Sequence, residues 1–302
     1  MNVVKLIAAD AGSVRPDWRV RAVRAAMRAA CAIAPERTSR FVDRIWFTPP
    51  RARVTPEAAA FLDAAEPLSL TLGATRATGY AWGTGPLALV MHGWGSHAGH
   101  LRGVIEALAG AGLRVVAFDA PGHGRSGDGE WGPGQANFRE MAQMLIAAAR
   151  EHGPVRALVA HSGGCTASAL ALRRGLAAER AVWFAPMGNP VDYAARYQRA
   201  LALSDEVMLR FRTRSTHRLG FDWNELDMVA LPRVVRTPPA LVVHDRDDAE
   251  TFASDGAAIA HAWPHSRFVR TIGLGHRGVL RDAAALEAMV GFVAPPLLRA
   301  VG

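Results

Sequence analysis

The chain has 302 residues, half of them hydrophobic and 21% charged, which excludes a chain that is disordered throughout and suits one α/β core with an insertion. The net charge of +8 is compatible with an anionic partner, but the arginines occur in nearly every segment and no nucleic-acid-binding motif is present. We therefore expect a small-molecule substrate and no nucleic-acid partner.

Neither a membrane span nor a cysteine-based site is predicted. The apolar N-terminal run ends at Asp10, short of signal-peptide length, and no other run approaches the ~20 residues of a membrane span. Cys31 and Cys165 lie far apart within helical patterns, which indicates reduced packing residues. The sequence thus predicts a cytoplasmic protein that needs neither metal nor organic cofactor, and it leaves the oligomeric state open.

Residues 1–66 are predicted to form an N-terminal helical segment and a linker. Apolar residues recur at helical spacing over 16–34, with Arg21, Arg24 and Arg28 on another face. Such a helix can lie on a membrane, but the favoured interpretation is that it docks on the domain and exposes its arginines. The proline-rich stretch 47–56 is the expected linker.

The main core is predicted over 67–185 and 239–302, where apolar runs alternate with helical patterns. This order predicts an α/β fold with a mostly parallel twisted sheet flanked by helices. The expected strands are 87–91, 115–118, 157–160, 181–184, 240–243 and 267–272, and the expected helices are 98–111, 135–151, 164–178, 250–263 and 281–293. Residues 186–238 exceed a simple crossover and are predicted to be a cap or lid insertion, with Phe211, Phe221 and Trp223 as an apolar wall for an acyl group.

The strongest chemical signal is the run Val159-Ala160-His161-Ser162-Gly163-Gly164 between a strand and a helix. A tight strand-to-helix turn needs small neighbours and projects its serine hydroxyl above the sheet, which favours Ser162 as a nucleophile. The helix that follows directs the N–H of Gly163 at a developing negative charge.

Two earlier glycine-rich turns follow the first core strands. In Met91-His92-Gly93-Trp94-Gly95, the glycines let the N–H of Trp94 face the substrate, so Trp94 and Gly163 are the expected oxyanion-hole donors. The turn formers of 119–126 predict a scaffolding role for Asp119.

The last two strands end in an aspartate cluster and in a glycine-flanked histidine. Asp245, Asp247 and Asp248 follow one strand and His276 follows the other, so that serine, acid and base occur in a workable order along the chain. Three other histidines flank turns and are expected to satisfy backbone hydrogen bonds: His92, His161 and His244.

The motifs HGWG at 92–95, DAPGHGRS at 119–126, AHSGG at 160–164, HDRDD at 244–248 and GLGH at 273–276 resemble the α/β-hydrolase superfamily, in its esterase, lipase and serine-aminopeptidase-like branch. The resemblance covers about residues 67–295 and departs from the family pattern at Ala160, at Asp245 and at the pair Ala249-Glu250.

The resemblance implies a serine hydrolase that cleaves a carboxylic ester, thioester or amide through an acyl-enzyme on Ser162, with a carboxylesterase (EC 3.1.1) as the expected class. It places the triad acid four residues after His244, at Asp248, with Asp247 as the alternative, and the base at His276. A serine at 162 disfavours the dehalogenase and epoxide-hydrolase relatives, which need an aspartate there. The alternative function is an acyltransferase or a non-hydrolytic ligand-binding member of the same fold.

Overall fold

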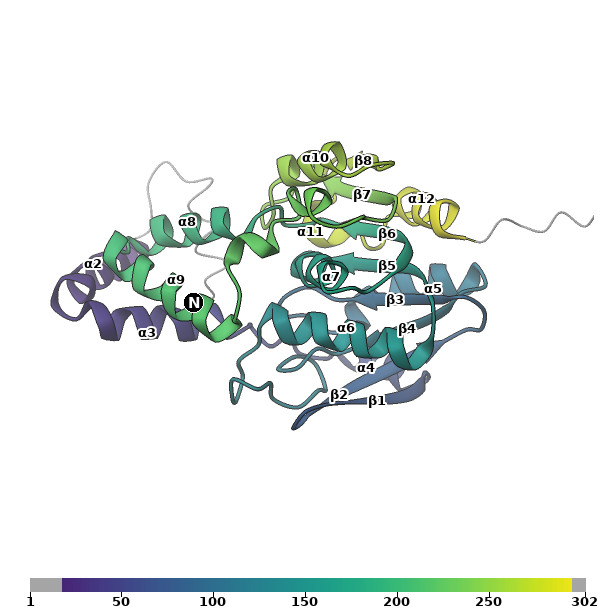
Figure 1. Ribbon diagram of the computed structural model, residues 1–302, viewed down its shortest axis with the longest axis horizontal. Coiled ribbons are helices and arrows are strands. Elements are labelled where there is room, and N and C mark those ends of the chain that lie inside the picture. The colour runs from purple at the N-terminus through teal and green to yellow at the C-terminus, as the bar shows by residue number, and fades with distance from the viewer. Residues whose placement is uncertain (1–17, 295–302) are drawn as a thin grey trace, which may run out of the picture.

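The computed structural model describes residues 18–294. Figure 1 shows an α/β core, with a lobe of helices beyond one end of its strands. The apolar run that ends at Asp10, and the first two residues of the helix predicted over 16–34, lie outside the described residues. Within the described range that helix is present as α2 (Trp18–Ile33).

Eight strands form a single sheet in the order β1-β2-β4-β3-β5-β6-β7-β8. The pairs β1·β2 and β2·β4 are antiparallel and all other pairs are parallel. The mostly parallel α/β architecture predicted from the sequence is therefore confirmed. The strand bounds are β1 (Glu66–Leu72), β2 (Thr75–Trp82), β3 (Leu87–Met91), β4 (Arg114–Phe118), β5 (Val155–His161), β6 (Ala178–Phe184), β7 (Ala240–Asp245) and β8 (Arg267–Thr271).

Helices cover both faces of the sheet, because successive side chains of each strand point to opposite faces. Leu89 and Met91 of β3 belong to a core that includes α6 (Phe138–His152) and α7 (Gly163–Arg173). Ala88 and Val90 belong to a second core with α5 and α12. The remaining core helices are η1 (Ala98–Leu101), α4 (Pro56–Asp63), α5 (Arg102–Gly110), α10 (Ala253–Ala262), α11 (Gly275–Gly278) and α12 (Ala283–Val293).

Four helices from distant parts of the chain form what we call the helical lobe: α2, α3 (Pro35–Trp46), α8 (Pro190–Leu201) and α9 (Asp205–Leu219). The ring of Trp46 contacts those of Tyr197 and Phe211 at centroid distances of 5.2 and 5.8 Å. Trp223 of the following turn η2 (Trp223–Leu226) stacks obliquely on Trp46 at 5.4 Å. The N-terminal segment and the 186–238 insertion therefore share one apolar core, a contact that the sequence did not predict.

This packing changes the role expected for the aromatic residues of the insertion. Phe211 and Trp223 are fully buried inside the lobe, so the expectation that they form an acyl wall is wrong. Phe221 instead lines a hollow of about 380 Å³ against α6 and α7.

Ion pairs also join α3 to α9. Glu36 pairs with Arg210 at 3.3 Å and with Arg214 at 2.7 Å, and Asp43 pairs with Arg218. Because these arginines are partly exposed, each pair contributes about 1 kcal/mol or less, and the aromatic core is the larger stabilising contribution.

Helix α3 was not predicted, because its charged outer face breaks the apolar pattern before the linker.

Cys31 and Cys165 are free and buried, as expected. None of the helices within residues 18–294 is long and apolar enough to cross a membrane.

Candidate active site

Ser162 occupies the turn that joins β5 to α7. Its backbone has φ 54° and ψ −129°, one of four non-glycine residues with positive φ among those described. This conformation is unfavourable for an L-residue and is held by hydrogen bonds on both sides, since Ser162 N–H donates to Phe184 O and Cys165 N–H donates to Ser162 O, each at 2.9 Å. The structure thus places the serine on a strained, half-buried strand-to-helix turn.

The turn has small neighbours because the 92–95 loop packs directly against it. A Cβ placed on Gly164 would lie 2.3 Å from the carbonyl oxygen of His92, so a larger residue cannot occupy this position. A Cβ placed on Gly163 would lie 3.4 Å from the backbone nitrogen of Trp94. The two N–H groups expected to form an oxyanion hole, those of Trp94 and Gly163, therefore belong to adjacent segments beside Ser162.

The loops after β7 and β8 bring Asp248 to His276. His276 Nδ1 lies 2.8 Å from Asp248 Oδ2, and the Asp248 side chain is fully buried. Asp248 Oδ1 accepts hydrogen bonds from the backbone N–H groups of Glu250 at 2.8 Å and Thr251 at 3.0 Å. Burial by itself would raise the pKa of Asp248, but the hydrogen bonds from His244 and His276 outweigh it and hold that pKa well below its usual range.

A second histidine shares this carboxylate. His244 Nε2 lies 3.3 Å from Asp248 Oδ2, and the Thr251 hydroxyl lies 2.9 Å from the same oxygen. The expectation that His244 satisfies backbone groups is therefore wrong, because its ring is turned toward the acid loop. Gly256 leaves room for that ring, since a Cβ there would lie 2.5 Å from His244 Nδ1. The position of His244 four residues before Asp248 is the only signal in the sequence for this contact.

His161, next to the serine, ties the base to the strand-to-helix turn. Its Nε2 lies 2.9 Å from the backbone oxygen of His276, and the two rings are 4.6 Å apart. Burial, reinforced by the positive charge that His276 can carry, lowers the pKa of His161 to about 3, so its ring stays neutral and can donate one hydrogen bond. The backbone role expected for His161 is confirmed by this contact, which links the segment of His276 to the residue that precedes Ser162.

The neighbouring aspartates hold the loops rather than the base. Asp245 Oδ2 accepts from the Thr271 hydroxyl at 2.8 Å and from the N–H of Leu274 at 3.1 Å, which anchors the loop before His276. Asp247 is half-exposed and pairs with Arg246 at 3.0 Å.

The loops on the other side of the serine are fixed in the same way. Asp119 is buried and accepts from the N–H groups of Ala98 and Arg125, each at 2.8 Å, which confirms its scaffolding role. His92 joins its loop to the next one, because its Nε2 accepts from the N–H of Ala120 at 3.0 Å.

One carboxylate approaches the free nitrogen of the base. Glu250 Oε2 lies 3.8 Å from His276 Nε2, and the Glu250 side chain is 28% exposed. Arg277 pairs with the other Glu250 oxygen at 3.3 Å. The negative charge of Glu250 therefore lies beside His276 Nε2, the ring nitrogen that faces away from Asp248. In the sequence, Glu250 was noted only as part of the pair Ala249-Glu250, which departs from the family pattern.

The insertion touches the acid loop through α8. Tyr193 Oη donates to Asp255 Oδ2 at 2.7 Å, and the N–H of Phe252 donates to Tyr193 Oη at 3.1 Å. Burial raises the pKa of Asp255 above its usual value. These contacts connect the helical lobe to the segment that carries Asp248.

The arrangement provides a hydroxyl on a strained turn, a histidine oriented by a buried carboxylate and two adjacent N–H donors. Those are the parts required for nucleophilic attack on an acyl carbon without a metal. Within the described residues, no group of three or more His, Cys, Asp or Glu side chains is placed to hold a metal ion.

Residues 86–294 match the family model described as serine aminopeptidase, S33. A Pyrococcus furiosus esterase shares 18% identity and a TM-score of 0.59 over 81% of this chain and 96% of its own. A thermophilic esterase from Thermogutta terrifontis shares 19% identity and a TM-score of 0.57 over 76% of this chain and 100% of its own. A proline iminopeptidase-related protein from Thermus thermophilus shares 21% identity and a TM-score of 0.56 over 76% of this chain and 99% of its own. At these identities the solved structures show the fold alone, and no curated protein sequence matches the chain.

The strain at Ser162 leads to a stability prediction. Replacing Ser162 with glycine should raise the free energy of unfolding by about 1 kcal/mol, because glycine adopts this backbone conformation without a Cβ clash. The matched control is Ser168→Gly in the middle of α7, where the same change should lower stability by about 0.5–1 kcal/mol. Urea denaturation followed by circular dichroism measures both, and a loss of stability in Ser162→Gly would show that the turn is not strained.

Proposed function

Because the chain belongs to the serine aminopeptidase S33 family of α/β hydrolases, we propose that it is a serine hydrolase that cleaves a carboxylic ester, or a related thioester or amide, through an acyl-enzyme on Ser162. The observation that supports this most directly is the 2.8 Å hydrogen bond between His276 and the buried carboxylate of Asp248, beside the strained turn of Ser162.

In the proposed mechanism, Asp248 accepts the Nδ1–H of His276 and so leaves Nε2 unprotonated and basic. His276 Nε2 takes the proton of Ser162 as the serine oxygen attacks the acyl carbon. The negative oxygen of the tetrahedral intermediate accepts hydrogen bonds from the N–H groups of Trp94 and Gly163.

His276 then gives its proton to the leaving group, and the carbon–leaving-group bond breaks to form the acyl-enzyme. Water then gives a proton to the same Nε2 as it attacks the acyl carbon. The bond between that carbon and the Ser162 oxygen breaks, His276 returns the proton to the serine oxygen, and the carboxylic acid is released. The helical lobe, which includes helices from the 186–238 insertion, is proposed to act as the cap, since the insertion leaves the sheet at the carboxyl end of β6.

The experiment that tests the nucleophile uses a fluorophosphonate probe and p-nitrophenyl esters of graded chain length, together with aminoacyl anilides. The wild type should be labelled on Ser162, and Ser162→Ala should lose labelling and lower kcat by about 10⁵ or more. The anilides distinguish peptidase from esterase activity. Full hydrolysis by folded Ser162→Ala would refute the assignment.

The acid is tested by comparing two adjacent aspartates. Asp248→Asn should lower kcat by about 10³ to 10⁴, because the base loses the acceptor that fixes its tautomer. Asp247→Asn removes the same charge from the same turn and should lower kcat by less than about tenfold, since Asp247 bonds to Arg246 and not to the base. Steady-state kinetics measure both variants, and unchanged circular dichroism spectra show that each is folded. A larger loss of kcat in Asp247→Asn than in Asp248→Asn would assign the acid to Asp247 instead.

Glu250 should influence the charge preference of the site. Its carboxylate beside His276 Nε2 should repel an anionic leaving group, so Glu250→Gln should raise kcat/KM for a carboxylated phenyl ester, relative to the uncharged ester, by about three- to tenfold. Asp247→Asn is again the charge-matched control and should leave that ratio unchanged. An unchanged ratio in Glu250→Gln would show that this carboxylate points away from the bound substrate.

A further inference from the structure

The positive charge of the chain is concentrated in the helical lobe. Residues 18–46 and 190–219 contain thirteen arginines and five carboxylates, so the lobe has the same net charge, +8, as the whole chain. The rest of the described residues contain nineteen arginines and twenty carboxylates and are close to neutral. The sequence-based view that the charge is scattered is therefore wrong in three dimensions, because two separate basic segments fold together.

The arginines on the two sides of α3 have different surroundings. Those facing the contact between α3 and α9, such as Arg214 and Arg218, pair with Glu36 and Asp43. On the outer side of α3, Arg37 and Arg44 are exposed, and neither pairs with a carboxylate of residues 18–294. The positive charges of Arg37 and Arg44 are thus directed to solvent.

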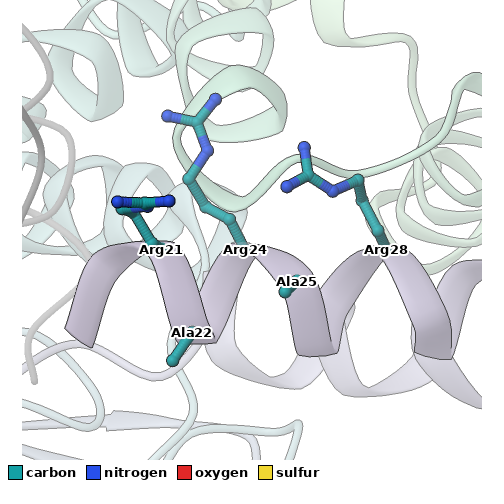
Figure 2. Close-up of a pocket in the computed structure, with 5 residues that line it drawn as sticks. All are labelled: Arg21, Ala22, Arg24, Ala25 and Arg28. Atoms are coloured by element: carbon teal, nitrogen blue, oxygen red, sulfur yellow. The ribbon is translucent and has the colours of Figure 1, made fainter. Parts of the chain in front are cut away.

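Helix α2 adds a row of arginines to this charge. Figure 2 shows Arg21, Arg24 and Arg28 projecting from one side of the helix, where they line a hollow of about 500 Å³. Figure 1 shows α2 at the outer end of the lobe, away from the sheet, and α3 running back from it alongside α9. The lobe therefore carries a row of arginines on α2 in addition to the exposed arginines of α3.

Large apolar side chains are exposed within the same lobe. Ile33 at the end of α2 is 83% exposed, Phe41 on α3 is 53% exposed and Leu209 on α9 is 68% exposed. Phe41 lies four residues after Arg37 and three before Arg44, so it shares their helix face, opposite buried Ser39. Exposed aliphatic and aromatic residues among arginines are typical of helices that rest in the headgroup layer of a membrane.

We propose that the outer face of α2 and α3, with Arg37, Phe41 and Arg44 at its centre, docks on an anionic phospholipid membrane. Arginines attract the anionic headgroups, and Phe41 and Ile33 enter the acyl boundary, which an aqueous polyanion does not provide. Ile33 cannot stack on bases, so this exposed aliphatic side chain favours lipid over single-stranded nucleic acid. Docking does not depend on the chemistry proposed for Ser162.

The test is vesicle flotation of the full chain. The protein should float with vesicles of phosphatidylglycerol and phosphatidylcholine in equal parts and not with phosphatidylcholine alone. Binding should weaken from about 0.1 M to about 1 M NaCl, as the Debye length falls from about 10 Å to about 3 Å. Ser162→Ala should bind as well as the wild type, which separates docking from catalysis.

Variants locate the surface. Arg37→Ala with Arg44→Ala should weaken binding by about tenfold or more and flatten its salt dependence, since each arginine near an anionic surface adds to the attraction. Phe41→Ala should weaken binding and keep the salt dependence. The matched control is Arg150→Ala with Arg270→Ala, which removes two exposed arginines from the core and should leave binding within about twofold, because those side chains lie outside the docking face.

Three outcomes would overturn the proposal. The protein could fail to float with anionic vesicles, or the two double variants could lose vesicle binding equally. Polyuridylate RNA could also displace the protein from the vesicles by binding the same arginines more tightly. Melting temperatures equal to that of the wild type show that each double variant is folded.

Discussion

The buried carboxylate of Asp248 is the constraint around which the candidate site is organised. A fully buried charge is costly unless hydrogen bonds satisfy it, and here the two backbone N–H groups, the threonine hydroxyl and the two histidines around it do so. These donors come from β7, from the loop after it and from the loop after β8. The carboxylate therefore fixes the relative position of the segments that carry the acid and the base.

Further hydrogen bonds connect the segments of the acid and the base to the turn that carries Ser162. Asp245 holds the loop before His276, and His161 holds the carbonyl of His276 from the residue next to the serine. Because β5, β6, β7 and β8 run parallel, their carboxyl ends meet at one edge of the sheet and each loop needs only a short reach. The geometry of the site follows from the sheet order together with a small number of buried polar bonds.

The helical lobe adds a second level of organisation. Its core forms only when Trp46 from the N-terminal segment meets Phe211 and Trp223 from the insertion. Tyr193 then connects this lobe to the loop after Asp248 through Asp255. The lobe is thus attached to the acid loop by these hydrogen bonds, and the same folding event gathers arginines that are far apart in the chain.

The sequence by itself determined the α/β class and most strand positions, because buried parallel strands are continuous apolar runs. The turns at the strand ends made Ser162 and His276 candidate residues, and the resemblance to α/β hydrolases favoured Asp248 over Asp247 as the acid. Local patterns also identified Asp119 as scaffolding. The tertiary structure alone decided the contact of His244 with Asp248, the approach of Glu250 to His276 and the burial of Phe211 and Trp223. Those features depend on side chains from separate segments that meet only after folding, so no local spacing encodes them. The distribution of charge is the same kind of property, since two moderately basic segments become one strongly basic lobe when α3 packs against α9.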